Sequence, residues 1–400
     1  MSRALSSRGL DSPRWLLSPA VTLMPSTSPI PRRLVRRALA GLGAGTVALA
    51  LSALAAPPMA EPKPLFEGGS RRLDVGPTPA GLAGTDAATC APCHQQIADE
   101  WRGSLHAAAW TEPVFQAAYA KEPLAYCRNC HAPQHTGDLP SGLAAKDGVS
   151  CATCHVRDGH ILGTGKTAYQ SRPPHPVEVV AELDESRYCT SCHQFGFLSE
   201  GGHGRPRVET AVLQQTTFDE WQARAAHLDG KRCQSCHMPE TGLGDATHRA
   251  HGFHVQGDAA FIRQAVSVAL SVSHDGGPAL LATLSPGVVG HAFPTGDLFR
   301  NLELRVWADD RPEQSVSLVY GRTYGDRRGS AGESARYVVS DTRVGVGDDV
   351  RRLDLTPLGQ AKTYHWRLDY RLMAPEIAHA RGISPASNVL TLDAGALPAQ

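Results

Sequence analysis

Apolar and polar residues alternate over short runs in the last third of the chain, a pattern typical of half-buried β-strands. Gly, Pro and Asp residues that favour turns separate these runs. Only Ala374–Ala380 has a helical pattern. Seven short strands favour an antiparallel β-sandwich of immunoglobulin-like size over residues 258–400. The predicted strands are Ala265–Ser273, Ala279–Leu284, Asn301–Trp307, Ser315–Val319, Arg351–Leu355, Thr363–Leu372 and Asn388–Leu392.

Residues 81–257 follow a different pattern, in which short helical stretches such as Gln95–Ala109 and Phe218–Ala226 alternate with Gly/Pro loops. One short motif, Asp-Glu-Trp, occurs twice: Asp99-Glu100-Trp101 precedes His106, and Asp219-Glu220-Trp221 precedes His227. These stretches are too short and too polar to build an ordinary apolar core. We therefore expect a mainly α and irregular domain whose interior is filled by something other than apolar side chains.

The N-terminal segment does not have the pattern of a folded domain. Four arginines between residues 32 and 37 precede an apolar run, Ala38–Ser52, and a small-residue cleavage site. This order predicts a signal peptide over residues 1–55, with Met24 as an alternative start. The run is short for a membrane span, so a retained anchor is the second interpretation. Residues 56–80 are rich in Pro and Gly and read as a linker.

The chemistry of the chain is concentrated in ten cysteines, which form five pairs of identical spacing. Each pair has the pattern Cys-x-x-Cys-His, the attachment signature of c-type haem. Two thiols add to the two vinyl groups of one haem, and the next histidine becomes the proximal ligand of its iron. The predicted attachment residues are Cys90, Cys93, Cys127, Cys130, Cys151, Cys154, Cys189, Cys192, Cys233 and Cys236. The predicted proximal ligands are His94, His131, His155, His193 and His237.

Two other uses of paired cysteines fit this pattern poorly. Zinc sites use such pairs two at a time, whereas this chain has five. Structural disulfides suit an exported protein, but they give no reason for a histidine after every second cysteine. We therefore predict five covalently bound haem c groups in a pentahaem domain over residues 81–257, with the polypeptide wrapped round stacked haems.

Each haem iron needs a sixth ligand or an open face, and the sequence favours histidine for this position. Methionine is scarce beyond the predicted signal peptide, where only Met238 and Met373 remain apart from Met59 at its border. Bis-histidine ligation and low potentials are therefore expected. The candidate distal ligands are His106, His135, His160, His175, His203, His227, His248, His251, His254 and His291. The other three histidines, His274, His365 and His379, are expected to be structural or on the surface.

The formal net charge of zero conceals an acidic mature chain. Residues 1–60 hold seven arginines and one acidic residue, which leaves 32 basic and 38 acidic residues after them. An acidic surface argues against binding to nucleic acid. It is compatible with other redox proteins as partners, such as quinol oxidoreductases or cytochromes.

The middle of the chain resembles the cytochrome c-554-type multihaem family. The resemblance rests on Cys90–Ala108, Gly148–Cys151, Tyr188–Gln194 and Cys233–Pro239, and on His251–Phe253 after the last motif. It implies closely packed haem pairs in a mostly helical domain, although this chain has five motifs where that type carries four haems.

The same resemblance implies that His106, His175 and His251 are distal ligands to haems bound elsewhere in the chain. The segment Gly290–Gly296 is similar to one that recurs after multihaem domains in exported cytochromes. His291 in this segment is either a ligand that reaches from the β-rich part or a histidine of a turn. The preferred distal candidates are therefore five of the ten histidines, namely His106, His160, His175, His251 and His291.

Three functions are compatible with five such motifs. The first is an exported electron carrier, periplasmic or on the cell surface, whose haems are bis-ligated and which has no catalytic residues of its own. The second is a multihaem oxidoreductase that acts on a small nitrogen or sulfur compound, such as nitrite, hydroxylamine or nitric oxide, at one open iron. The third is a structural module that docks through its β-sandwich. The number of histidines available as second iron ligands favours the first function.

Overall fold

The structure of the chain is a computed structural model, which describes residues 72–137, 139–165, 174–200, 206–243, 247–255, 257–328, 334–346 and 350–399. The predicted signal peptide, most of the predicted linker and His203 lie outside these residues. We call residues 72–257 the motif region and residues 258–399 the β region. Within the described part of the chain, no helix has the length and apolar character needed to cross a membrane.

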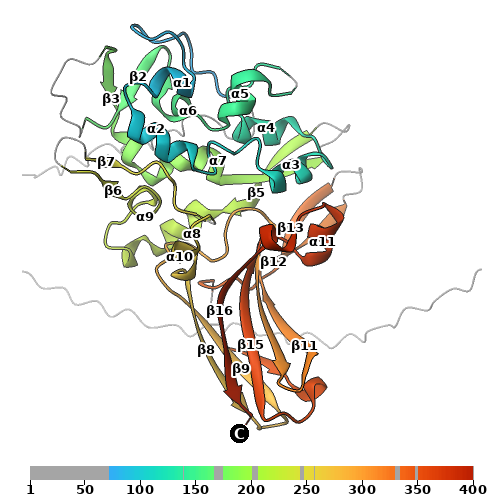
Figure 1. The fold of residues 1–400 in the computed structure, drawn as a ribbon. Helices are drawn as coiled ribbons and strands as arrows, with labels where there is room; N and C mark the ends of the chain where they lie inside the picture. The colour runs from blue at the N-terminus through green and yellow to red at the C-terminus, as the bar shows by residue number, and fades with distance from the viewer. Residues whose placement is uncertain are drawn as a thin grey trace, which may run out of the picture. The chain divides into compact units, whose positions relative to one another are not determined.

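The motif region consists of short helices joined by loops and small sheets (Figure 1). Its α-helices are α1 (Ala87–Cys90), α2 (Gln95–Arg102), α3 (Pro113–Tyr119), α4 (Ala125–His131), α5 (Gly142–Asp147), α6 (Cys151–His155), α7 (Thr190–His193), α8 (Thr217–Arg224) and α9 (Cys233–His237). Its strands are β1 (Val156–Arg157), β2 (His160–Gly163), β3 (Val177–Val179), β4 (Gln194–Glu200), β5 (Pro206–Thr216), β6 (Glu240–Thr241) and β7 (His248–Arg249).

Local sequence explains several helix boundaries. The side chain of Asp86 accepts a hydrogen bond from the Thr89 backbone and caps α1. Helix α3 starts with Glu112 as its cap and Pro113 at its first position, where proline is favoured. Helix α2 is shorter than the predicted Gln95–Ala109 because it ends at Arg102 before Gly103. The second predicted helix is present as α8.

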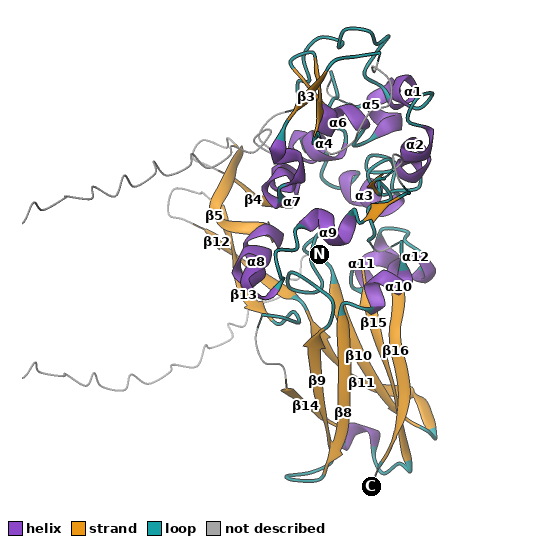
Figure 2. Cartoon of the chain, turned by 90° about the vertical axis from the view of Figure 1, so that its left-hand side faces the viewer, coloured by secondary structure: helices purple, strands orange, loops and turns teal. Residues whose placement is uncertain are grey.

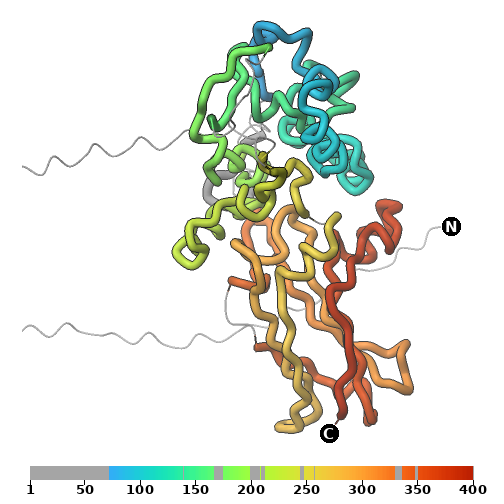
Figure 3. Tube along the Cα trace, turned by 60° about the vertical axis from the view of Figure 1, so that its left-hand side comes forward, coloured from blue at the N-terminus to red at the C-terminus, as the bar shows by residue number. Residues whose placement is uncertain are grey.

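The β region contains longer strands and little helix (Figure 2). Its strands are β8 (Val266–Ser273), β9 (Ala279–Pro286), β10 (Asn301–Ala308), β11 (Arg311–Tyr320), β12 (Arg322–Arg328), β13 (Ser334–Asp341), β14 (Val350–Asp354), β15 (Thr363–Arg371) and β16 (Val389–Pro398). Its helices are α10 (Ala259–Arg263), α11 (Pro375–Ala380) and α12 (Pro385–Asn388). The tube in Figure 3 shows the yellow segment around α10 leading directly into β8.

Two antiparallel sheets of the β region share one apolar core. The first has the order β11-β10-β15-β16 and the second has the order β14-β9-β8. Alternate residues of β10 point inward, and Leu302, Leu304 and Val306 are all fully buried. Leu280 of β9 and Leu368 of β15 belong to the same cluster. Because both sheets contribute to it, this core is one continuous layer of side chains.

All seven strands predicted from alternation are present, and so is the predicted helix near residue 374. The antiparallel sheets are therefore confirmed, whereas an immunoglobulin-like topology remains a prediction. The hairpin of β12 and β13 was not predicted. Its strand β12 has the sequence Arg-Thr-Tyr-Gly-Asp-Arg-Arg and offers no apolar face to recognise.

Candidate functional site

The five Cys-x-x-Cys-His motifs lie on or at the ends of short helices. Four of them form or end the helices α4, α6, α7 and α9, and the first begins at the last residue of α1. On a helix, residues three and four positions apart share one face, so both thiols and the histidine of a motif point to the same side. No disulfide bond joins any of the ten cysteines.

One cavity of about 2200 Å³ is lined by all ten cysteines and all five motif histidines. Sites for single small ligands usually measure roughly 300–1,000 Å³. A space of this size therefore has room for several large prosthetic groups. No cluster of three or more metal-binding side chains forms among the described residues, which differs from the closed four-ligand arrangement of structural zinc.

Histidines from distant parts of the chain face four of the motif histidines across this cavity. The ring centroids are 6.4 Å apart for His94 and His175, and 6.1 Å apart for His193 and His106. They are 6.2 Å apart for His155 and His251, and 6.3 Å apart for His237 and His291. Two metal–imidazole bonds of about 2 Å, plus about 1 Å from each nitrogen to its ring centre, give roughly 6 Å. All four spacings fit one iron between two imidazoles.

Backbone carbonyls hold many of these rings through their Nδ1 atoms. Nδ1 lies 2.8 Å from the Ala109 oxygen in His131, 2.9 Å from the Leu162 oxygen in His155 and 2.7 Å from the His254 oxygen in His237. On the opposite side, Nδ1 of His251 lies 2.7 Å from the Arg249 oxygen and Nδ1 of His291 lies 2.9 Å from the Ala292 oxygen. A carbonyl can only accept, so Nδ1 carries the proton and the Nε2 lone pair is available for a metal.

The surroundings also keep these imidazoles neutral. Burial, reinforced by neighbouring histidines, lowers the pKa of His106 to about 3 and the pKa of His193 to about 4. The same two causes lower the pKa of His251 to about 4. Only the neutral ring can donate its lone pair to a metal, so burial prepares these side chains for ligation.

His131 differs from the other four motif histidines. Its ring stacks on Phe115 of α3, with centroids 3.6 Å apart and planes 9° apart. Among the described residues no histidine ring lies across from it at the spacing of the other pairs. His135, four residues further on, is buried, and its two nitrogens contact the Gly137 carbonyl and the Asn129 side chain.

The rings of the remaining candidate histidines contact other groups or are exposed. His160 is exposed on β2, 3.8 Å from Glu178, and lines a small separate pocket. His248 is 3.1 Å from Glu100, and His254 is 3.0 Å from Asp258. His227 is exposed. His160 therefore faces no motif histidine. Four other candidates each face one, namely His106, His175, His251 and His291.

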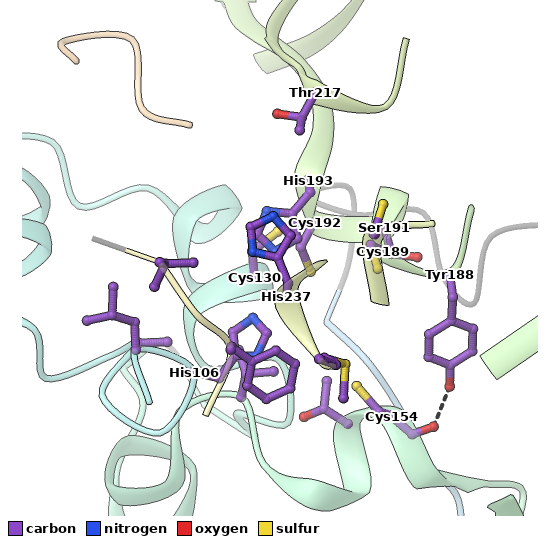
Figure 4. Close-up of a pocket in the computed structure, with 18 of the residues that line it drawn as sticks. His106, Cys130, Cys154, Tyr188, Cys189, Ser191, Cys192, His193, Thr217 and His237 are labelled. Carbon is purple, nitrogen blue, oxygen red and sulfur yellow. Dashed lines mark hydrogen bonds between the residues drawn. The ribbon is translucent and has the colours of Figure 1, made fainter. Parts of the chain in front are cut away.

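Cysteines of different motifs approach one another inside the cavity. The thiols of Cys90 and Cys151, of Cys130 and Cys192, and of Cys189 and Cys233 lie close enough for one to shift the pKa of the other. Figure 4 shows Cys130 and Cys192 next to His193 and His237, with His106 facing the same space. The dashed line in Figure 4 marks the hydrogen bond from the Tyr188 hydroxyl to the Cys154 carbonyl. The attachment points are therefore packed closely together.

Comparison with known proteins agrees with these features. Residues 89–156, which contain the first three motifs, match the family described as cytochrome c554 and c-prime. The crystal structure of a penta-haem cytochrome c552 from Thermochromatium tepidum is similar in fold, with a TM-score of 0.60 and 20% sequence identity. The resemblance to multihaem c-type cytochromes is confirmed. The match covers 80% of this chain and 100% of that cytochrome, a larger share than the motif region alone.

A search of curated proteins finds no match. The multihaem cytochrome resemblance supports covalently bound haem c and a role in electron transfer or another redox process. Sequence reasoning did not identify Glu100 and Glu220 as residues of the site, although the repeated Asp-Glu-Trp segments were a visible signal.

Proposed function

We propose that this protein is an exported pentahaem cytochrome that transfers electrons between redox partners. The observation that carries the proposal is the set of four histidine pairs with centroid spacings of 6.1–6.4 Å in one cavity. Each pair joins a motif histidine to a histidine far away in sequence. This is the arrangement expected of bis-histidine haem sites, in which both axial positions of the iron are filled.

The proposed attachment and ligand residues follow from this geometry. The ten motif cysteines hold five haems, and the five motif histidines are the proximal ligands. His175, His106, His251 and His291 serve as distal ligands opposite His94, His193, His155 and His237. When bound, haem c supplies a one-electron iron couple, and the protein sets its potential through ligands, burial and hydrogen bonds. His160 is not part of this ligand set.

Contacts between motifs suggest the order of the electron path. Cys192 and Cys189 of the fourth motif contact Cys130 of the second and Cys233 of the fifth. Both also interact electrostatically with Cys154 of the third motif. The third motif contacts the first through Cys151 and Cys90. We therefore propose that the haem at the fourth motif lies at the centre of the electron path, next to the haems of the second, third and fifth motifs. The haem at the first motif lies at one end of the path.

The end of this path at the first motif is the most accessible. Cys93 is exposed, whereas the other nine motif cysteines are part-buried. Electron exchange with a partner, such as a quinol oxidoreductase or another cytochrome, is proposed to occur there. The predicted signal peptide makes the periplasm the proposed location, with the cell surface as the alternative.

A second function is favoured by one specific observation at His131. His131 is the last residue of α4 (Figure 1), and among the described residues no histidine ring faces its own, so the iron at the second motif is a candidate for an open face. The carboxylates of Asp297 and Glu112 interact electrostatically with His131. Arg300 lines the same cavity and donates a hydrogen bond to the Tyr370 hydroxyl. Such a site could act on a small nitrogen or sulfur compound.

EPR spectra of the purified ferric protein, recorded with and without cyanide or nitric oxide, separate these functions. Haem content and intact mass, measured on the same sample, establish whether five haems are attached. We expect four low-spin bis-histidine signals that do not respond to either ligand. A response of any of these four would contradict the pairing, and fewer than five haems would contradict the cofactor assignment.

The signal of the fifth haem decides the second function. A high-spin signal that responds to cyanide supports an open face at His131, and a fifth unresponsive low-spin signal leaves electron transfer alone. If the face is open, Arg300→Gln is expected to weaken cyanide binding because it removes a cation from the cavity wall. Arg305→Gln, which changes an arginine on β10, is the matched control.

A further inference from the structure

The repeated Asp-Glu-Trp segments contact the two halves of two different histidine pairs. The first segment lies on α2 and the second on α8. In both, the glutamate side chain leaves its own helix and accepts a hydrogen bond from the backbone of a distant loop. Glu100 Oε2 lies 2.9 Å from the His251 backbone nitrogen, and Glu220 Oε2 lies 3.1 Å from the Ala292 backbone nitrogen.

Both loops carry a proposed distal ligand. The Glu100 contact is made to His251 itself, whose ring faces His155 at 6.2 Å. The Glu220 contact is made to the residue directly after His291, whose ring faces His237 at 6.3 Å. A carboxylate that accepts a backbone N–H forms a strong, charge-assisted hydrogen bond. Each glutamate therefore fixes the backbone from which one distal imidazole extends.

The neighbouring tryptophans contact the opposite half of the same two pairs. The indole nitrogen of Trp101 donates to the Val149 carbonyl at 2.9 Å, two residues before Cys151 of the third motif. The indole nitrogen of Trp221 donates to the Lys231 carbonyl at 3.1 Å, two residues before Cys233 of the fifth motif. These motifs contain His155 and His237, the partners of His251 and His291.

Each glutamate also has a basic side chain beside its other oxygen. His248 Nε2 lies 3.1 Å from Glu100 Oε1, and Arg343 Nη2 lies 2.6 Å from Glu220 Oε1. Arg343 is only 4% exposed and is also 2.7 Å from Asp341. A part-buried carboxylate needs such partners to remain charged. The two segments therefore share four features: a glutamate, a basic partner, a loop with a distal histidine and a tryptophan that contacts the proximal motif.

We infer that Glu100-Trp101 and Glu220-Trp221 are two copies of one clamp, each of which sets the distance between the two histidines of one haem site. This inference rests on the proposed function, because it takes His251 and His291 as haem ligands. The glutamates and tryptophans are positioning residues and do not ligate the metal. Groups that hold ligands from outside the coordination shell commonly determine how firmly a metal is bound.

The two clamps act on different haems, which allows a direct test in the full-length haem-loaded protein. The variants are Glu100→Ala and Glu220→Ala, with Glu100→Gln and Glu220→Gln as conservative versions that keep an acceptor oxygen. The adjacent aspartates provide matched controls, Asp99→Asn and Asp219→Asn, because both are exposed. His251→Ala and His291→Ala show the spectrum that results when a distal ligand is lost.

The measurements are EPR spectra of each ferric variant and the rate at which cyanide binds. We expect Glu100→Ala to change only the signal of the His155–His251 site, and Glu220→Ala to change only that of the His237–His291 site. Cyanide binding at the affected site should become faster, by roughly 10-fold to 100-fold if it follows the effect that loss of such outer groups has on metal affinity or activity. The glutamine variants should show a smaller change, because their amide oxygen still accepts the N–H hydrogen bond.

Different failures identify which idea is wrong. If His251→Ala and His291→Ala change the spectra but the glutamate variants match the aspartate controls, the clamp is wrong and the ligand assignment stands. If the glutamate variants alter every haem signal to a similar extent, their role is general folding and the clamp is also wrong. If His251→Ala and His291→Ala leave the spectra and the cyanide rates unchanged, the ligand assignment itself is wrong.

Discussion

The motif region and the β region bury apolar side chains to very different extents. In the β region, twenty buried residues from both main sheets and the surrounding loops form one cluster. The cluster within the motif region has four, namely Leu73, Val75, Ala152 and Val156. Most of the large cavity is lined by the motif region, although residues such as His291 and Arg300 contribute from the β region.

This difference indicates that the two regions are stabilised in different ways. Burial of apolar surface is the main favourable contribution to folding, and the β region has enough of it to form a conventional core. The motif region encloses a cavity of about 2200 Å³ where a core would be. Haems that fill this cavity would provide both the apolar surface and the cross-links between segments.

The largest expected effect is therefore that of removing haem altogether. In full-length protein produced without haem attachment, we expect residues 72–257 to be unfolded and readily cleaved by protease. The β region should keep its strands, because its own core is intact. Limited proteolysis with mass spectrometry, alongside far-UV circular dichroism, measures this. If both regions of the haem-free protein resist protease equally, the proposal that only the motif region depends on haem for its stability is wrong.

A smaller effect is expected from a cavity in the β core. Leu304 is fully buried on β10, so Leu304→Ala should lower the free energy of unfolding of the β region by about 2–5 kcal/mol. Denaturant unfolding monitored by tryptophan fluorescence provides the value, and the haem absorption spectrum should be unchanged before unfolding begins. Val319→Ala is the control, because Val319 is 51% exposed and its truncation should cost less than about 0.5 kcal/mol. Similar losses for both would show that the core is not what stabilises this region.

The smallest expected effect concerns one hydrogen bond of the motif region. Trp101→Phe keeps an aromatic ring but removes the indole N–H that donates to the Val149 carbonyl. We expect a loss of about 0.5–1.5 kcal/mol, the usual contribution of one hydrogen bond. Thermal unfolding of the haem-loaded protein measures it, with Trp307→Phe in the β region as the matched control. Trp307 packs on His365 in the β region. The control should therefore leave the stability of the motif region unaltered.

Much of the fold was predictable from local patterns. Strict alternation identified every strand of the two main sheets, because one face of each is buried and the other is not. The hairpin of β12 and β13 lacked that signal, since most of β12 is exposed and polar. The end of α2 was placed too late, because the turn after Gly103 retains residues that also favour helix.

The candidate site was predictable only in part. The five attachment motifs were evident because two thiols and a histidine within five residues already have the spacing that haem requires. Among the distal candidates, His160 and His175 could not be told apart by sequence, yet only His175 faces a motif histidine. The contacts of Glu100 and Glu220 were not predicted either, because each joins segments that are distant along the chain.

The sequence by itself was enough to predict which residues attach haem and which histidines are proximal, because the spacing within one helical turn sets that geometry. Tertiary structure alone decided which second histidine faces each of them and left His131 without a described histidine partner. It also brought His291 of the β region to His237 of the motif region. Such pairings depend on how loops and sheets pack across long sequence separations, and no local pattern of residues specifies that packing.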